Sequence, residues 1–251
     1  MSTTPNIFKQ IWSWFLVMVG RLISWILMDI TVIGLENAPT KGPLIVTANH
    51  FSWFDAPLLT MYLPVKPAFL IAIESQRFFW VRLFTNAFNG IPIWRGRADR
   101  KAMRQALQTL DDGNAVGIFP EGGIDPRTAK KREAGELIVN TGYEHFSRSD
   151  GELTHAKPGT IYLAVESQAM ILPVALIGTE NVLNNVFRFR RTPVTIQIGP
   201  AFGPLIIESE LSNSERKQRM KKLSEEVMMR IARLFPSEKR GPYRNMNLEA
   251  F

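Results

Sequence analysis

Cysteine is absent from the 251-residue chain, and histidine occurs only three times. The absence of cysteine excludes disulfides, cysteine nucleophiles and thiolate metal sites. His50, His145 and His155 are too few and too scattered to form a recognisable zinc site, so we expect no metal centre. Charged residues make up 21% of the chain and hydrophobic residues 45%, a balance that excludes disorder throughout.

The basic residues outnumber the acidic ones, which gives a net charge of +7. Such an excess favours anionic partners: nucleic acid, anionic lipid or phosphorylated substrates. Sixteen Phe and six Trp favour lipid, and no nucleic-acid-binding motif accompanies the basic residues. The length allows one large domain or two small ones, with enough residues to bury a core.

The most apolar stretch of the chain comprises residues 7–28. As a helix it would extend about 33 Å, enough to cross a bilayer. Arg21 would then lie near the membrane centre at a cost of about 2.5–3.5 kcal/mol, so we expect a helix that lies in one leaflet. Trp12, Trp14 and Trp25 suit the headgroup region. A helix buried against the domain is the alternative, and the lack of a small-residue cleavage site disfavours a signal peptide.

Short apolar segments alternate with helical ones, which predicts an α/β fold: a mixed β-sheet covered by helices. The predicted strands are residues 29–35, 42–48, 67–73, 90–94, 115–119, 171–177 and 194–198. The predicted helices are residues 97–110, 160–168 and a C-terminal amphipathic helix that ends before Pro236. The basic face of the C-terminal helix is either solvated or attracted to anionic lipid.

We expect three parts along the chain: an N-terminal membrane-associated helix at 1–33, an α/β domain at 34–207, and a basic amphipathic helix with a tail at 208–251. A segment rich in both charges, at about 128–156, interrupts the α/β domain. It is either a lid over the site or a surface loop.

The strand at 42–48 leads into Asn-His-Phe-Ser-Trp-Phe-Asp, which places His50 five residues before Asp55. A carboxylate that holds the Nδ1–H of an imidazole leaves Nε2 free as a base. No third residue acts as a nucleophile, so His50 would take a proton from a substrate hydroxyl, and that oxygen would attack an activated acyl group. Alternatively, Asp55 caps the helix that begins near Pro57, a role compatible with the first.

Two further polar residues follow predicted strands. Arg95 comes after the strand at 90–94 and can bind a phosphate through two parallel hydrogen bonds. Glu121 lies in a glycine turn after the strand at 115–119 and can accept a hydrogen bond from a hydroxyl, while Gly122 lets the backbone approach a ligand closely. Taken singly, these residues also fit a solvated arginine and an ordinary loop glutamate.

Together, the motifs NHxxxxD at 49–55, GIPIWR at 90–95, FPEG at 119–122 and ILPV at 171–174 follow one another in a characteristic order. In this order they resemble the motif blocks of the glycerolipid acyltransferases, above all the 1-acylglycerol-3-phosphate (lysophosphatidic acid) acyltransferases. The resemblance covers about residues 30–205. It implies the glycerol-3-phosphate acyltransferase-like fold.

The resemblance also implies roles for individual residues. His50 would be the general base and Asp55 the residue that orients it, while Arg95, Glu121 and Gly122 would bind the phosphorylated glycerol acceptor. The acyl donor would be acyl-CoA or acyl carrier protein, with no cofactor and no metal. The enzyme would be membrane-associated, on the cytoplasmic face.

The chain departs from the family pattern in three places. FPEG usually continues with Thr-Arg-Ser, but here Gly123-Ile124-Asp125 follows, so a cation is missing unless Arg127 replaces it. Ile73 stands where many members carry a lysine, and the Lys-x-Gly that soon follows FPEG is delayed to residues 157–159. These departures leave two alternatives: the same chemistry on another lipid acceptor, or a lipid-binding protein without activity.

Overall fold

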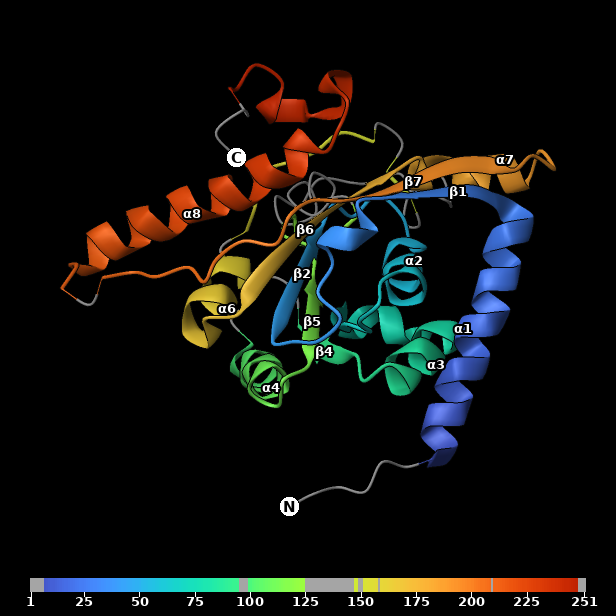
Figure 1. Cartoon of the computed structure of the whole chain (residues 1–251), viewed down its shortest axis with the longest axis horizontal. Helices are drawn as coiled ribbons and strands as arrows, with labels where there is room; N and C mark the ends of the chain where they lie inside the picture. Colours follow the sequence, from blue (N-terminus) through green and yellow to red (C-terminus); the bar gives the residue numbers. More distant parts are fainter. Residues whose placement is uncertain are drawn as a thin grey trace.

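The structure is a computed structural model that describes residues 7–94, 99–124, 147–148, 151–157, 159–208 and 210–247. A seven-stranded sheet forms its centre (Figure 1), with the order β1-β7-β6-β2-β5-β3-β4. The strands are β1 (Met28–Ile33), β2 (Leu44–Ala48), β3 (Ala68–Ala72), β4 (Ile91–Ile93), β5 (Ala115–Ile118), β6 (Met170–Ile177) and β7 (Thr192–Ile198). Neighbouring strands are parallel except for β6 and β7, so the predicted mixed sheet is confirmed.

Helices cover both faces of the sheet, and each face has its own hydrophobic cluster. On one face lie α4 (Arg100–Asp111), α6 (Gly159–Ser167) and α8 (Asn213–Arg233). On the other face lie α1 (Ile7–Leu27), α2 (Asp55–Tyr62), α3 (Phe79–Ala87) and α7 (Val182–Val186), as Figure 1 shows. This double cover explains why β2 is buried at every position and lacks the polar alternation of a half-exposed strand.

The helix α3 has no counterpart among the predicted elements. Its large aromatic residues Phe79 and Trp80 are exposed, whereas the small residues Thr85 and Ala87 are buried. This inverts the usual relation between side-chain size and burial, so the apolar pattern does not indicate which face packs. The predicted helices at 97–110, 160–168 and the C-terminus are confirmed as α4, α6 and α8.

One face of α1 packs on α2. Gly20 lies so close to Met61 that a Cβ on Gly20 would collide with its sulfur. The Arg21 guanidinium donates from Nε and Nη2 to the backbone oxygen of Met61, at 3.0 and 2.6 Å, and Ser24 hydrogen-bonds Tyr62 at 2.9 Å. Arg21 therefore points toward the body of the protein, where the free carbonyls at the end of α2 satisfy its charge.

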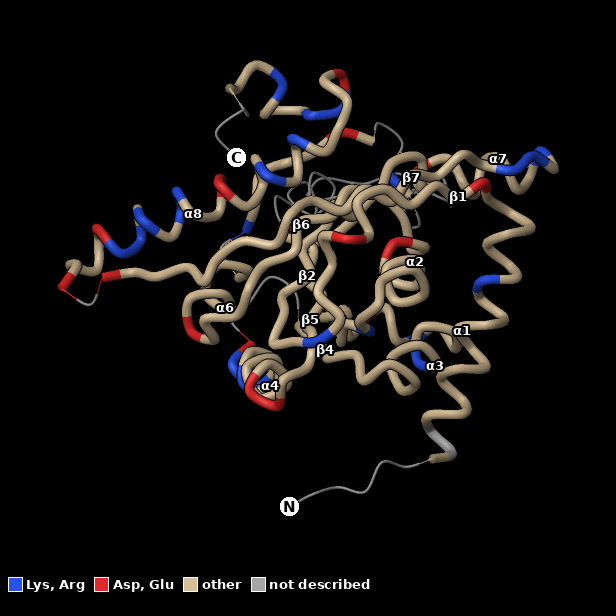
Figure 2. Tube along the Cα trace, in the orientation of Figure 1, with Lys and Arg blue, Asp and Glu red and all other residues tan. Residues whose placement is uncertain are grey.

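The opposite face of α1 is apolar and exposed, with little of the helix buried. Residues 10–27 are long and apolar enough to cross a membrane, by length and composition alone. Figure 2 shows few charged residues on α1, in contrast to α8. The exposed large apolar residues of α1 are Ile7, Ile11, Trp12, Trp14, Phe15, Met18, Leu22, Ile23, Trp25 and Ile26. The alternative of a helix buried against the domain is therefore wrong.

The carboxyl ends of the parallel strands lie at the same edge of the sheet. Residues 49–54 follow β2 there, and residues 119–124 follow the neighbouring strand β5. In an open parallel sheet this edge is where ligands bind.

Candidate active site

His50 and Asp55 meet in the loop between β2 and α2. The Nδ1 atom of His50 lies 3.0 Å from Oδ2 of Asp55. The same oxygen accepts hydrogen bonds from the backbone N–H groups of Phe51, at 2.7 Å, and Ser52, at 2.8 Å. The N-cap position of α2 is Phe54, without a side-chain cap. The interpretation of Asp55 as a helix cap is therefore wrong, because its carboxylate faces back into the loop.

These contacts fix the tautomer of His50. A carboxylate oxygen that already accepts two backbone N–H groups is an acceptor, so Nδ1 carries the proton and Nε2 carries the lone pair. Asp55 is fully buried, whereas the His50 side chain is 18% exposed. In the described part of the chain, Nε2 of His50 has no hydrogen-bond partner, so it is open to a substrate hydroxyl.

Aromatic stacking fixes the plane of the His50 ring. The imidazole lies on the Phe119 ring with centroids 4.0 Å apart and an interplanar angle of 9°. Phe119 stacks in turn on Phe69, at 5.3 Å and 18°. The histidine is thus held at one edge by a carboxylate and on one face by a ring, which is the preorganisation that a general base needs. The sequence motif gave no indication of the Phe119 contact.

Asn49 fixes the backbone just before His50. Its amide group donates to the backbone oxygen of Leu176 at 2.8 Å and accepts from the N–H of the same residue at 2.7 Å. The buried side chain thus replaces a strand partner where β2 ends beside β6. This gives a structural reason for an asparagine before the histidine, a role that the sequence analysis did not assign.

The carboxylate of Glu121 is fully buried, and protein donors surround it. Oε1 accepts the backbone N–H of His50 at 3.2 Å. Oε2 accepts from Nη1 of Arg148 at 2.5 Å, and from the N–H and hydroxyl of Thr154 at 3.0 and 2.7 Å. Glu121 therefore contacts the backbone N–H of His50 and not its imidazole ring.

Arg148 comes from the predicted insertion, and the sequence analysis did not single it out. Its guanidinium also donates to the backbone oxygens of Ile124 at 2.6 Å and Glu152 at 2.7 Å. Its own N–H donates to the backbone oxygen of Phe51 at 2.6 Å. Arg148 therefore ties the turn after β5 to the loop of His50. Most of the insertion, residues 128–146 and 149–150, lies outside the described residues.

Gly122 follows in the same turn with φ 78°, a conformation that glycine adopts without strain. Its N–H donates to the backbone oxygen of Phe119 at 2.9 Å. The predicted phosphate ligand Arg95 lies outside the described residues, as does Arg127. No cluster of three or more potential metal ligands occurs in the described ranges.

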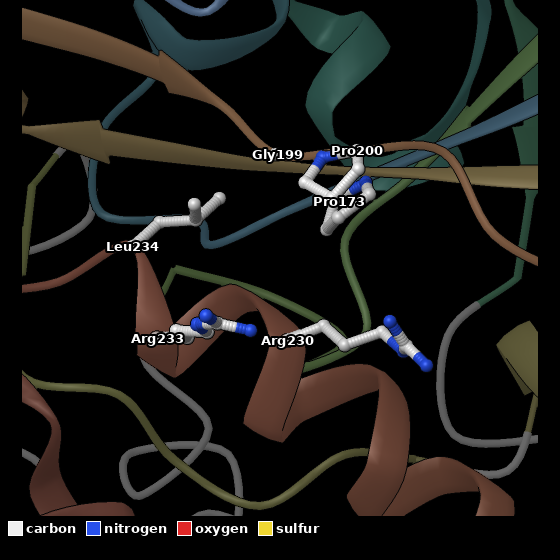
Figure 3. A pocket seen from close by; sticks show the side chains of 6 residues that line it. All are labelled: Pro173, Gly199, Pro200, Arg230, Arg233 and Leu234. Carbon is white, nitrogen blue, oxygen red and sulfur yellow. The ribbon is translucent and has the colours of Figure 1, made fainter. Parts of the chain in front are cut away.

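A cavity of about 230 Å³ lies between β6 and α8 (Figure 3). Pro173, of the ILPV motif, lines it together with Leu234 and the arginines Arg230 and Arg233. The Arg230 guanidinium lies 4.0 Å from the centroid of the Phe202 ring, and burial lowers its pKa from the usual value. His50 and Asp55 do not line this cavity.

The family model for acyltransferases matches residues 29–177. The chain belongs to the acyltransferase family. The matched residues include β2 to β6, His50, Asp55 and Glu121, and the partners Phe119, Arg148 and Thr154 described above. The predicted family is thereby confirmed.

Two curated relatives of this acyltransferase are both named 1-acyl-sn-glycerol-3-phosphate acyltransferase. The 1-acyl-sn-glycerol-3-phosphate acyltransferase of Borreliella burgdorferi is 27% identical over 208 residues, which are 78% of this chain and 72% of the relative. The Limnanthes douglasii protein of the same name is 28% identical over 192 residues, 72% of this chain. The chain spans 58% of the length of the Limnanthes protein.

The fold of this acyltransferase matches a solved structure, the 1-acyl-sn-glycerophosphate (LPA) acyltransferase PlsC from Thermotoga maritima. The TM-score is 0.59 at 24% identity, over 90% of this chain and 82% of the other. The predicted α/β fold of this family is therefore confirmed.

Proposed function

We propose that this acyltransferase moves a fatty acyl group from an acyl thioester to the free hydroxyl of lysophosphatidic acid. The product is phosphatidic acid, an intermediate of phospholipid biosynthesis. The names of the relatives support the choice of acceptor. The observation that carries the proposed chemistry is the hydrogen bond between His50 and the buried Asp55, which presents Nε2 of an accessible imidazole.

The proposed reaction is a direct transfer. Nε2 of His50 takes the proton of the acceptor hydroxyl as its oxygen attacks the thioester carbonyl carbon. Asp55 stabilises the imidazolium that forms. The tetrahedral intermediate collapses to the ester, the carbon–sulfur bond breaks, and the leaving thiolate takes the proton from His50. Acyl-CoA and acyl carrier protein both supply a suitable thioester, and either donor is compatible with this step.

The substrate-binding residues are part of the same proposal. Arg95 and Gly122 are proposed to hold the phosphorylated glycerol. The carboxylate of Glu121 is buried among protein donors. We propose that it contributes to acceptor binding by holding the backbone N–H of His50 in place. The intact His50–Asp55 pair also counts against a lipid-binding protein without activity, since such a protein has no use for an oriented base.

We propose that α1 holds the enzyme on the membrane by lying in one leaflet, on the cytoplasmic face where the thioester donors are soluble. The orientation of Arg21 toward Met61 supports this, because it leaves the outer face of α1 apolar. The basic face of α8 adds attraction to anionic lipid in this proposal. In the proposed division, 1–33 is the anchor, 34–207 the catalytic domain and 208–251 the basic helix and tail.

The test is transfer of a labelled long-chain acyl group to lysophosphatidic acid in detergent micelles, with acyl-CoA and acyl carrier protein as donors in parallel. We expect product from the wild type, and a loss of at least about 100-fold in His50→Ala. His155→Ala is the matched control, because the His155 side chain is 68% exposed and contacts Glu225 rather than the site. Activity of His50→Ala within about tenfold of the wild type would contradict the general-base role. Absence of product from the wild type with both donors would contradict the choice of lysophosphatidic acid as the acyl acceptor.

A further inference from the structure

A lysine side chain lies across the turn that follows β5. A Cβ placed on Gly122 would lie 2.5 Å from Cδ of Lys157 and 3.2 Å from its Nζ. The glycine therefore leaves open the space that the lysine occupies. Because the N–H of Gly122 is bonded to the backbone of Phe119, whose ring stacks on His50, the lysine lies at the turn beside the catalytic histidine.

Two anchors fix the backbone of Lys157 relative to this turn. Its own N–H donates to the backbone oxygen of Pro120 at 2.7 Å. Just before it in the chain, Thr154 donates twice to Glu121. The position of Lys157 is thus set by the same carboxylate that holds the backbone of His50, although the two residues are far apart in the sequence.

The charges around the turn leave the Lys157 ammonium available. Its side chain is exposed, and it forms no ion pair or side-chain hydrogen bond within the described ranges. Arg148 is 4% exposed and its donors are bonded to Glu121 and to backbone oxygens, so it cannot reach a ligand. The side chains of Asp55 and Glu121 are fully buried, and Oδ2 of Asp55 and both oxygens of Glu121 accept hydrogen bonds from protein donors, so neither carboxylate pairs with the exposed lysine.

We propose that Lys157 binds the anionic headgroup of the acyl acceptor, its phosphate, and thereby sets the preference for a phosphorylated acceptor. This inference rests on the proposed function. An ammonium offers three donors and a full charge to a phosphate. The helix α6 starts at Gly159, so its positive end lies on the same segment and adds to the favourable field. In this role a segment about 35 positions further along the chain supplies a cation to the turn that contains Gly122.

The experiment is steady-state kinetics with lysophosphatidic acid, with acceptor and donor varied in turn. In Lys157→Met we expect the acceptor KM to rise about 10- to 100-fold, as for loss of a charged hydrogen bond, with the donor KM unchanged. Lys157→Arg keeps the charge and is expected to stay within about threefold of the wild type. Lys66→Met is the matched control. Lys66 is also an exposed lysine, but it precedes the amino end of β3, whereas Lys157 lies at the turn that follows the carboxyl end of β5.

Three outcomes would overturn the assignment. An acceptor KM of Lys157→Met equal to that of Lys66→Met would show that the lysine binds no acceptor phosphate. A rise in the donor KM alone would place the lysine at the phosphates of the thioester donor. Absence of product from the wild type would contradict the proposed function itself, and with it this role, whereas the first two outcomes leave the acyl transfer intact.

Discussion

The carboxylate of Glu121 accepts a hydrogen bond from the backbone N–H of His50 at 3.2 Å. The glutamate of the FPEG motif therefore acts inside the protein, where it joins the catalytic loop to residues that follow it by about thirty positions, Arg148 and Thr154. This relationship explains how a long insertion can coexist with an ordered site, since its end is bonded back to the motif.

The pair Arg148–Glu121 is expected to stabilise the fold. Arg148→Met leaves a buried carboxylate without its cation and should lower the free energy of unfolding by about 3–5 kcal/mol. Adding Glu121→Gln removes the unpaired charge and should recover part of this loss. Urea denaturation of the two single variants and the double variant measures the coupling. Strictly additive effects would show that the two side chains do not interact.

Asp55 has two functions that substitution can separate. Asp55→Asn keeps an oxygen for the N–H groups of Phe51 and Ser52 but loses the charge, so we expect kcat to fall by about 10³- to 10⁴-fold with the fold intact. Asp55→Ala leaves both N–H groups unsatisfied, which should cost a further 1–3 kcal/mol or so of stability each. Thermal denaturation and kcat, measured on both variants, check this. Equal stability of the two variants would contradict the role of Asp55 as the acceptor for the N–H groups of Phe51 and Ser52.

Gly122→Ala tests the space over the turn. Its φ of 78° disfavours alanine by about 1–2 kcal/mol, and the new methyl group would displace Lys157. We expect a small loss of thermal stability together with a rise in acceptor KM like that of Lys157→Met. Gly113→Ala is the control, because Gly113 has φ 75° and nothing near its Cβ position. A normal acceptor KM in Gly122→Ala would argue against the position of the lysine.

Membrane binding is expected to depend on the exposed face of α1. Replacing Trp14 and Trp25 by serine should reduce binding to liposomes by at least about tenfold, since each ring would otherwise leave water for the bilayer. Thermal stability should not change, because both side chains are more than half exposed. Ile206→Ser, at an exposed position between β7 and α8, is the control.

Co-sedimentation with liposomes at high salt, which screens the basic face of α8, measures the contribution of α1 alone. Unchanged sedimentation of the double variant would contradict the anchor. Deletion of residues 1–28 is a less clean test, because Met28 is buried and pairs with Thr192 in the sheet.

Local features of the sequence were enough to predict most of the fold. The apolar runs of β2, β5 and β6 and the helical periodicity of α4 and α8 depend only on neighbouring residues. Gly113 follows α4 with the positive φ that is common just past a helix end, and a glycine at such a position is itself a local signal. The contact between His50 and Asp55 could also be predicted from their spacing, because a single short loop joins them.

The sequence by itself thus determined the order of the elements, the family and the histidine–aspartate pair. Only the tertiary structure decided which groups the charged side chains meet. Arg21 binds the backbone of Met61, Arg148 binds Glu121, and the side chain of Lys157 packs over Gly122. The partners in these pairs lie about 27 to 40 positions apart, and no periodicity links them. Their pairing follows from the way helices and loops pack around the sheet, because a side chain meets the groups that the folded chain places beside it. The buried Arg148 in particular must find acceptors there.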